Sequence, residues 1–272
     1  MKDRARQCIA ICMLGVFLLY VTGCTSPQFK LVKEEEFQQP VAINLPVANE
    51  DLEAKLDHLI YYNGPGFWKK DALWDEYVFT ILNTSDVQMK IADLFLVDPL
   101  DVRFHPAVNL WKIHDGNARH LRLYKKKGII ATNDVDPVLM AGAVVAVASL
   151  EIAATAGMAA TSGMTGLYVA GAAVFIVLPA ILIVGTGVMI SNSRARKLIN
   201  EEFERRDLDF PIILEPGEAV QGSVFYPVIP SPQSFQIQYQ LQNESQWGEP
   251  LFLECSLDVF KGLHEKYPDN KD

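Results

Sequence analysis

The side chains of this chain that could do chemistry are few, and the four cysteines come first. A thiol can carry a lipid, form a disulfide or act as a nucleophile. Cys8 and Cys12 lie in an apolar stretch near the start, and Cys24 directly follows that stretch. Apolar side chains alternate around Cys255, which predicts a small buried strand residue; a free reactive thiol is the alternative. Cys24 is therefore the cysteine with the clearest chemistry.

Other reactive groups form no recognisable set. His114 and His120 are six positions apart, with Asp115 between them. At this spacing, neither a helix nor a strand would bring the two histidines neatly together. The sequence contains no nucleophile elbow, no phosphate-binding loop and no zinc-spaced group of cysteines and histidines. We therefore expect no catalytic residue, no metal and no cofactor, and we expect that the protein is not an enzyme.

An aromatic cluster precedes the first clear strand pattern. Phe67, Trp68 and Trp74 lie close to Lys69 and Lys70 in the sequence. Such residues could lie at a membrane interface. We expect instead that they pack on or cap the core.

Residues 1–23 have the pattern of a secretory leader. Three basic side chains within the first six residues precede the apolar run Ile9–Val21. That run is shorter than the roughly 20 residues needed to span a bilayer. It ends in Val21-Thr22-Gly23-Cys24, an apolar residue and a small residue before a cysteine. This motif resembles the lipobox of bacterial envelope lipoproteins.

The lipobox resemblance implies a processing route. The leader would be cut between Gly23 and Cys24, and the Cys24 thiol would carry a diacylglyceryl group. The new amino group would receive a further acyl chain such as palmitate. Several acyl chains give stable anchoring where one would not. Thr25, in place of the aspartate that retains lipoproteins at the inner membrane, implies the outer membrane. An uncleaved anchor helix is the alternative.

A second apolar region covers residues 138–190. Val138–Ala160 contains one charged residue, Glu151, and Leu167–Ile190 contains none. Each half would reach roughly 35 Å as a helix, enough to cross the hydrocarbon core. Small residues at helical spacing let two helices approach closely, so the pattern predicts a helical hairpin and resembles the glycine-zipper hairpins of envelope proteins. The expected membrane or helix-packing positions are Gly142, Ala146, Glu151, Gly157, Gly171, Pro179 and Gly185.

Three roles are open for this hairpin. It could enter a bilayer, pack on the rest of the protein or in a helical oligomer, or associate into a pore. An even number of spans keeps both flanking parts of the chain on one side of a membrane. Lys125–Lys127 before it and Arg194–Lys197 after it could contact anionic headgroups. These charges would lie on the translocated side, which disfavours simple insertion into the inner membrane.

The remaining sequence predicts mostly strands. Before the apolar block, Glu50–Tyr61 has the spacing of a short amphipathic helix, and Tyr77–Leu82 and Val87–Val97 predict a hairpin around the turn Asn83–Asp86. Weaker strand candidates are Val102–Phe104, Asn109–Ile113 and His120–Tyr124. After the block, Val188–Arg206 predicts a solvated charged helix with ion pairs four residues apart. Further strands are predicted at Phe210–Leu214, Ala219–Tyr226, Phe235–Leu241 and Leu251–Val259.

This strand pattern resembles the immunoglobulin-like modules of bacterial envelope proteins. The resemblance lies in the Asn-x-Ser-Asp turn at Asn83–Asp86 and the late Pro-Gly turn before Gly222–Pro227, and it covers roughly residues 70–125 and 208–262. The expected fold class is α+β, an immunoglobulin-like antiparallel β-sandwich interrupted by the inserted apolar Ala/Gly-rich helical hairpin. The expected organisation is a leader (1–23), a tether (24–49), a first sandwich part with an N-terminal helix (50–137), the hairpin (138–190), a charged helix (191–207) and a second sandwich part (208–272).

Charge and anchoring together set the expected function. The net charge is -9, and it becomes -11 when the leader, with three basic residues and one acid, is removed. Such a surface repels phosphate backbones, so nucleic acid is not an expected partner. We expect a non-catalytic, membrane-anchored envelope lipoprotein, facing the periplasm, with a structural, tethering or assembly role. The alternative is a lipid-interacting or pore-forming protein that acts through its hairpin. The expected partners are membrane lipid and, through the hairpin, other envelope proteins or further copies of the chain.

Overall fold

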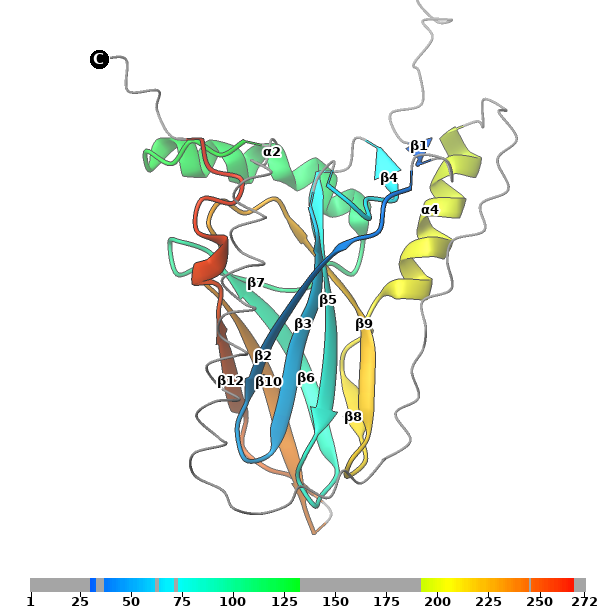
Figure 1. Ribbon diagram of the computed structural model, residues 1–272, viewed down its shortest axis with the longest axis vertical. Coiled ribbons are helices and arrows are strands. Elements are labelled where there is room, and N and C mark those ends of the chain that lie inside the picture. Colours follow the sequence, from blue (N-terminus) through cyan, green and yellow to red (C-terminus); the bar gives the residue numbers. More distant parts are fainter. Residues whose placement is uncertain are drawn as a thin grey trace, which may run out of the picture.

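The computed structural model describes residues 30–32, 37–61, 64–70, 73–132, 192–244 and 246–266. The expected lipidation site at Gly23 and Cys24 and the apolar block 138–190, with its seven expected packing positions, lie outside these residues. Figure 1 shows the large sheets with the longer helices gathered at one end of them. The described part is mostly antiparallel β-sheet with few helices.

The first large sheet has the strand order β2-β3-β5-β9, and every pair in it is antiparallel. Its strands are β2 (Val41–Ala48), β3 (Leu52–Ile60), β5 (Trp74–Asn83) and β9 (Ala219–Pro227).

The second large sheet is built around β6 and β10, which pair with each other. Its strands are β6 (Met89–Val97), β7 (Arg103–Phe104), β8 (Ile212–Leu214), β10 (Ser234–Asn243), β11 (Gln246–Trp247) and β12 (Leu251–Ser256). A separate two-stranded ribbon joins β1 (Lys30–Leu31) to β4 (Lys69–Lys70). The helices are α2 (Leu110–Lys126), α4 (Asn192–Arg206) and the short η2 (Asp258–Phe260).

The two large sheets share one hydrophobic core. The ring of Phe235 on β10 packs edge-on against two rings of β5. The distance between ring centroids is 4.9 Å to Tyr77 and 4.8 Å to Phe79. Tyr226 on β9 also contacts Phe235, and its hydroxyl donates to the carbonyl of Leu94 on β6. Edge-on aromatic pairs stabilise a core beyond the area they bury. These contacts fix the distance between the sheets.

Strand β5 is buried on both of its faces, and this explains why the molecule has a second core. Tyr77 and Phe79 point into the core between the sheets. Trp74 and Val78, on the opposite face, belong to a second hydrophobic cluster that α2 and α4 cover. Because successive side chains alternate across a strand, the buried carboxylate of Glu76 also lies on the helix-covered face.

The helix predicted at Glu50–Tyr61 is wrong, because these residues form strand β3. Leu52, Ala54 and Leu56 alternate into the core as a strand requires. The register then shifts between Leu56 and His58, so that one extra residue allows Leu59 to face the same core. This bulge creates a three-residue apolar spacing, which the sequence pattern alone cannot distinguish from a helical turn.

The hairpin predicted from Tyr77–Leu82 and Val87–Val97 is also wrong, although both strands exist. Strand β5 pairs with β3 and β9, while β6 pairs with β10, β7 and β8 in the other sheet. The side-chain amide of Asn83 donates to the carbonyl oxygens of Val87 and Leu214. Its side-chain oxygen accepts from the backbone and hydroxyl of Ser85. Asn83 thus holds a turn that carries the chain from one sheet to the other.

The strands predicted at Asn109–Ile113 and His120–Tyr124 are both replaced by the single helix α2. The side chain of Asn109 accepts hydrogen bonds from the first free backbone N–H groups, at Trp111 (2.9 Å) and Lys112 (3.3 Å). Leu110, Asn117 and Tyr124 are buried at a seven-residue spacing, which is two helical turns. The strand predicted at Val102–Phe104 is confirmed as β7.

The predictions for the later part of the chain agree better with the structure. The strands at Phe210–Leu214, Ala219–Tyr226 and Phe235–Leu241 are found as β8, β9 and β10, and the strand at Leu251–Val259 is found as β12 followed by η2. Helix α4 has the predicted pairs, among them Lys197 with Glu201 at 3.6 Å. It is not fully solvated, since Ile199, Phe203 and Arg206 are buried.

Part of the segment predicted as a tether is folded. Val41–Ala48 forms β2, and its Ile43 and Leu45 are buried in the core between the sheets. Among the described residues, no helix combines the length and apolar character needed to cross a membrane.

Candidate functional site

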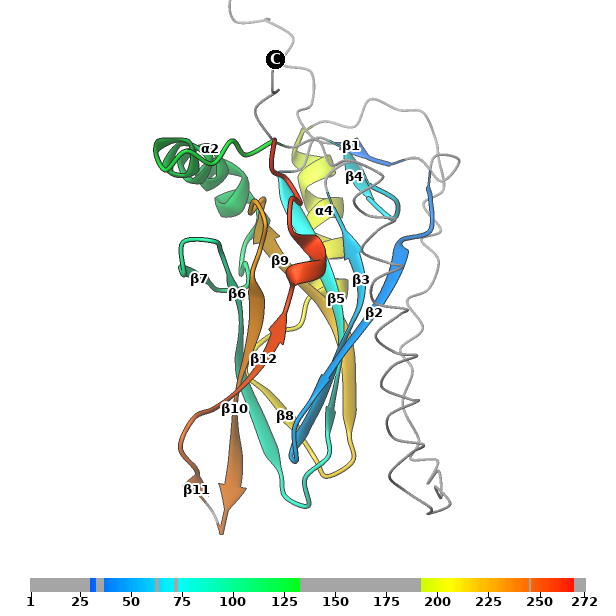
Figure 2. The ribbon, with the colours of Figure 1, turned by 60° about the vertical axis from the view of Figure 1, so that its left-hand side comes forward.

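The helices and the N-terminal ribbon gather at one end of the sheets, which we call the helical end (α2, α4, β1 and β4). Figures 1 and 2 show all four elements at this end, opposite the turn between β5 and β6. The indole N–H of Trp111 on α2 donates to the side-chain oxygen of Asn200 on α4, at 2.9 Å. Helix α4 also contacts β1, which pairs with β4. The helical end is thus a connected structure.

A buried ammonium group lies at the centre of this end. Lys69 is 1% exposed, and its Nζ lies 3.7 Å from the ring centroid of Trp74 and 4.8 Å from that of Trp111. Trp68 packs against Trp74 with centroids 6.4 Å apart. The electron-rich faces of indole rings stabilise a cation that has lost its water. The aromatic cluster predicted from the sequence is therefore part of the second core, as expected, and it encloses a charge.

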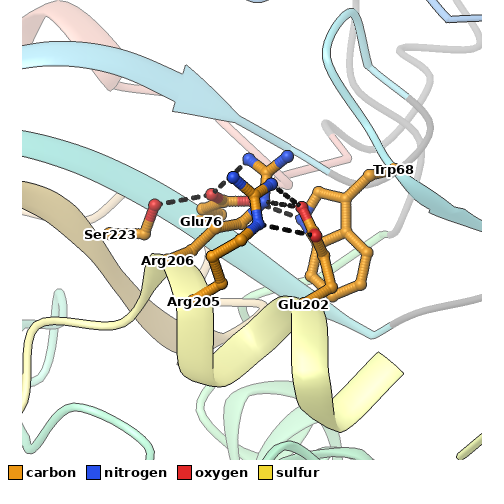
Figure 3. A network of polar contacts seen from close by, with 6 residues as sticks. All are labelled: Trp68, Glu76, Glu202, Arg205, Arg206 and Ser223. Atoms are coloured by element: carbon orange, nitrogen blue, oxygen red, sulfur yellow. Dashed lines mark hydrogen bonds and ion pairs between the residues drawn. The ribbon is translucent and has the colours of Figure 1, made fainter. Parts of the chain in front are cut away.

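A network of charges joins α4 to β5 next to this cluster (Figure 3). The Glu76 carboxylate accepts from the indole of Trp68 (2.6 Å) and the hydroxyl of Ser223 (2.6 Å). The guanidinium of Arg206 lies 3.3 Å from the same carboxylate through Nη1. The side chains of Glu76 and Arg206 are 2% and 6% exposed. This is a buried ion pair between the first sheet and the end of α4.

The outer part of the network is formed by α4 itself. Glu202 accepts from Arg206 Nε (2.5 Å) and from Arg205 Nε and Nη2 (3.0 and 2.6 Å). Burial alone would raise the pKa of Glu202, but hydrogen bonds and positive charge from the two arginines outweigh it and lower that pKa. Likewise, Glu76 and Glu202 raise the pKa of Arg206 against the opposing effect of burial. Each charge in the network is thus compensated.

The lowered pKa of Glu202 fixes the sign of its pH dependence. The usual pKa of a glutamate carboxyl group is 4.5, and in the folded state the pKa of Glu202 is lower. Such a group stabilises the folded state at pH values above 4.5. The contribution is lost as the pH falls through the folded pKa. The contribution of Glu202 to stability is therefore fully present at neutral pH.

Asp207, the next residue, has the opposite behaviour. Its Oδ1 is buried and has no hydrogen-bond partner among the described residues. Burial, and then the negative charge of Asp209, raise its pKa from 3.8 to about 7, although the backbone N–H of Leu208 partly opposes this. The folded state therefore binds a proton that the unfolded state releases. Stability falls as the pH rises from about 4 to about 7, and the loss is complete above about 7.

Asp207→Asn is accordingly expected to stabilise the protein at high pH. The gain in the free energy of unfolding should be about 1 to 2 kcal/mol near pH 8, after allowing for partial solvent screening, and clearly smaller near pH 5. Denaturant unfolding at both pH values measures it. Asp86→Asn, which changes an exposed carboxylate, serves as the control and should show no such pH dependence. Equal effects of Asp207→Asn at both pH values would contradict the assignment.

A second buried pair holds the chain where it approaches the apolar block. His264 and Asp75 are both fully buried, and His264 Nε2 lies 2.8 Å from Asp75 Oδ2. The other ring nitrogen of His264 lies 3.2 Å from the carbonyl oxygen of Thr132, and Thr132 N–H donates to the carbonyl of His264 at 2.8 Å. Asp75 is near the start of β5, at the helical end. The last described residue before the apolar block is therefore fixed at that end.

The side chains of His114 and Asp115 lie outside the described part of the structure, and the other candidates from the sequence do not form a reactive site with described residues. Cys255 is buried, as expected, and burial raises the pKa of its thiol to about 11. A thiol with that pKa stays protonated at neutral pH and is a poor nucleophile. The ring of His120 packs edge-on against Phe104, with centroids 5.3 Å apart. Within the described ranges, no group of three His, Cys, Asp or Glu side chains could hold a metal ion.

A polar cavity of about 760 Å³ lies beside β10, β12 and η2. Its carboxylates are engaged by hydroxyl groups: Ser231 donates to Glu265 (2.6 Å) and Ser234 donates to Glu254 (2.7 Å). Neither histidine nor cysteine is among the described residues that line it.

The sequence analysis missed Glu76, Arg206, Asp75 and His264. One signal was available for two of them, since Asp75 and Glu76 are adjacent carboxylates in a strand that is otherwise mostly apolar. Buried carboxylates require partners. Nothing in the sequence identifies those partners, because Arg206 lies 130 positions from Glu76 and His264 lies 189 positions from Asp75.

No family model, no curated protein and no solved structure matches this chain.

Proposed function

We propose that this protein is a non-catalytic lipoprotein of the bacterial cell envelope with a structural, tethering or assembly role. In this proposal, acyl chains on Cys24 hold the protein to a membrane. The favoured location is the outer membrane, with the folded part in the periplasm. Its fold is an immunoglobulin-like sandwich, and the apolar residues 138–190 form an inserted helical hairpin.

One observation supports this proposal best: the chain segments next to Cys24 and next to the apolar block lie at the same end of the domain. Strand β1 starts at Lys30, six positions after Cys24, so at most about 20 Å of extended chain separates them. Helix α2 precedes the apolar block and α4 follows it. All three elements lie at the helical end (Figure 1). An acyl anchor and an apolar segment would therefore attach to the same end of the domain, and that end would face the membrane.

The attachment of the apolar block on both sides agrees with a tethering role. On one side, Thr132 is hydrogen-bonded to His264. On the other side, the buried pair of Arg206 and Glu76 fixes α4 to the first sheet. A segment that enters a membrane orients a domain only if its ends are firmly joined to that domain. Among the described residues, the segment that precedes the block and the helix that follows it are both joined to the domain in this way.

The proposal is tested by labelling with radioactive palmitate in growing bacteria that express the full chain. Label should enter the wild-type protein and be lost completely in Cys24→Ser, because that change removes the acylated sulfur. Cys255→Ser is the matched control and should keep full labelling, since Cys255 is buried in the core. Equal labelling of Cys24→Ser and wild type would refute the proposed anchor.

A further inference from the structure

Helix α2 has a strongly basic outer face. The helix contains five lysines and arginines and one aspartate, in a chain whose net charge is -9. Lys112, Arg119, Arg122 and Lys126 are all exposed. At 100° per residue these four fall within one stripe along the helix. Leu123 lies in the same stripe and is 51% exposed.

The described residues of the protein do not compensate the positive charge of this stripe. Within the described part of the chain, none of the five basic residues of α2 forms an ion pair. Helix α4 is different, because Lys197, Arg205 and Arg206 each pair with a glutamate. The charges of α2 are thus available to an external anion.

The inner face of α2 fixes the direction of this stripe. The hydroxyl of Tyr124 donates to Asp98 at 2.9 Å, and Asp98 in turn accepts from the backbone N–H groups of Leu100 and Val102. Leu110, at the other end of α2, is buried in the second core. Anchored at both ends, α2 lies across the helical end of the sheets (Figures 1 and 2). Its basic stripe is on the helix face opposite the buried Leu110, Asn117 and Tyr124.

We propose that this stripe of α2, formed by Lys112, Arg119, Arg122, Leu123 and Lys126, binds the anionic headgroups of a phospholipid surface. The inference rests on the proposed function for its orientation, since the helical end is the one that an acyl anchor would bring to the membrane. Basic side chains near an anionic leaflet are each attracted to it, and an exposed leucine among them enters the headgroup region. Binding at α2 adds a second contact to the acyl anchor and holds the domain upright on the membrane.

Vesicle binding by the full-length Cys24→Ser chain tests this inference. The probes are vesicles of phosphatidylcholine alone and of equal parts phosphatidylcholine and phosphatidylglycerol. The chain should prefer the anionic vesicles, and the preference should fall as salt is added. The triple change Arg119→Gln, Arg122→Gln and Lys126→Gln should reduce the ratio of the two affinities by about 100-fold, at about five-fold per charge.

The matched control is Lys55→Gln, Lys90→Gln and Lys261→Gln, which changes the net charge equally with residues outside α2 and α4. It should keep the preference. Thermal unfolding of both triple variants confirms that they fold. An unchanged preference in the α2 variant, or an equal loss in the control, would overturn the inference. Because the chain used here has no Cys24 thiol, the result is independent of acylation, so failure of the anchor and failure of the α2 surface are distinguishable.

Discussion

Arg206→Met is expected to lower the free energy of unfolding by about 3 to 5 kcal/mol. The change leaves the buried carboxylate of Glu76 without its cation, and water does not reach it there to compensate. Trp68 and Ser223 still donate hydrogen bonds to Glu76, but neither carries a positive charge. Denaturant unfolding measures the loss.

Two further variants separate the charge effect from a loss of packing. Arg196→Met, at an exposed position of the same helix, should cost less than about 1 kcal/mol. Adding Glu76→Gln to Arg206→Met should recover part of the stability, because the second change removes the uncompensated charge. A cost for Arg206→Met no larger than that for Arg196→Met would show that the pair does not fix α4 to the sheet.

Phe235→Ala is expected to cost about 3 to 5 kcal/mol. Its ring is fully buried and contacts Tyr77, Phe79 and Tyr226 from the opposite sheet, so its loss leaves a cavity that these rings cannot fill without moving. Thermal or denaturant unfolding gives the value.

The control is Phe252→Ala on the neighbouring strand β12. Phe252 is 49% exposed, and the same truncation there should cost about 1 kcal/mol or less. Similar costs at both positions would mean that the two sheets do not share the core that the aromatic contacts define.

Much of the sheet could be predicted because its strands have regular alternation. Strand β10 places Phe235, Ile237 and Tyr239 in the core and glutamines on the other face, and the period of two is visible in the sequence. Strand β3 could not be predicted in this way. Its bulge changes the phase of the pattern once, and the shifted pattern has the spacing of a helix.

Strand pairing was less predictable than strand location. Nothing in the short turn after Asn83 distinguishes a return within one sheet from a crossing to the other. The crossing depends on a hydrogen bond from Asn83 to Leu214, which is 131 positions away. Helix α2 was missed because its apolar residues, taken in short windows, resemble two strands. Its helical period appears only when Leu110, Asn117 and Tyr124 are considered together.

The candidate site also has a part that the sequence could predict and a part that depends on the fold. The lipobox-like motif is local, since its chemistry depends only on the residues directly before Cys24, and so the sequence alone could raise the hypothesis. The gathering of β1, α2 and α4 at one end depends on the whole fold. Before the structure, Lys112 and Arg122 belonged to two different predicted strands, and Arg119 and Lys126 lay outside both of them. As a helix, α2 places them on one face.

The mass of the intact protein, purified from bacterial membranes with its native N-terminus, tests the central claim most directly. The account predicts a chain that begins at Cys24 and carries a diacylglyceryl group on its sulfur atom. A chain that begins at Met1 and carries no acyl mass would contradict the anchor and the membrane-facing orientation derived from it.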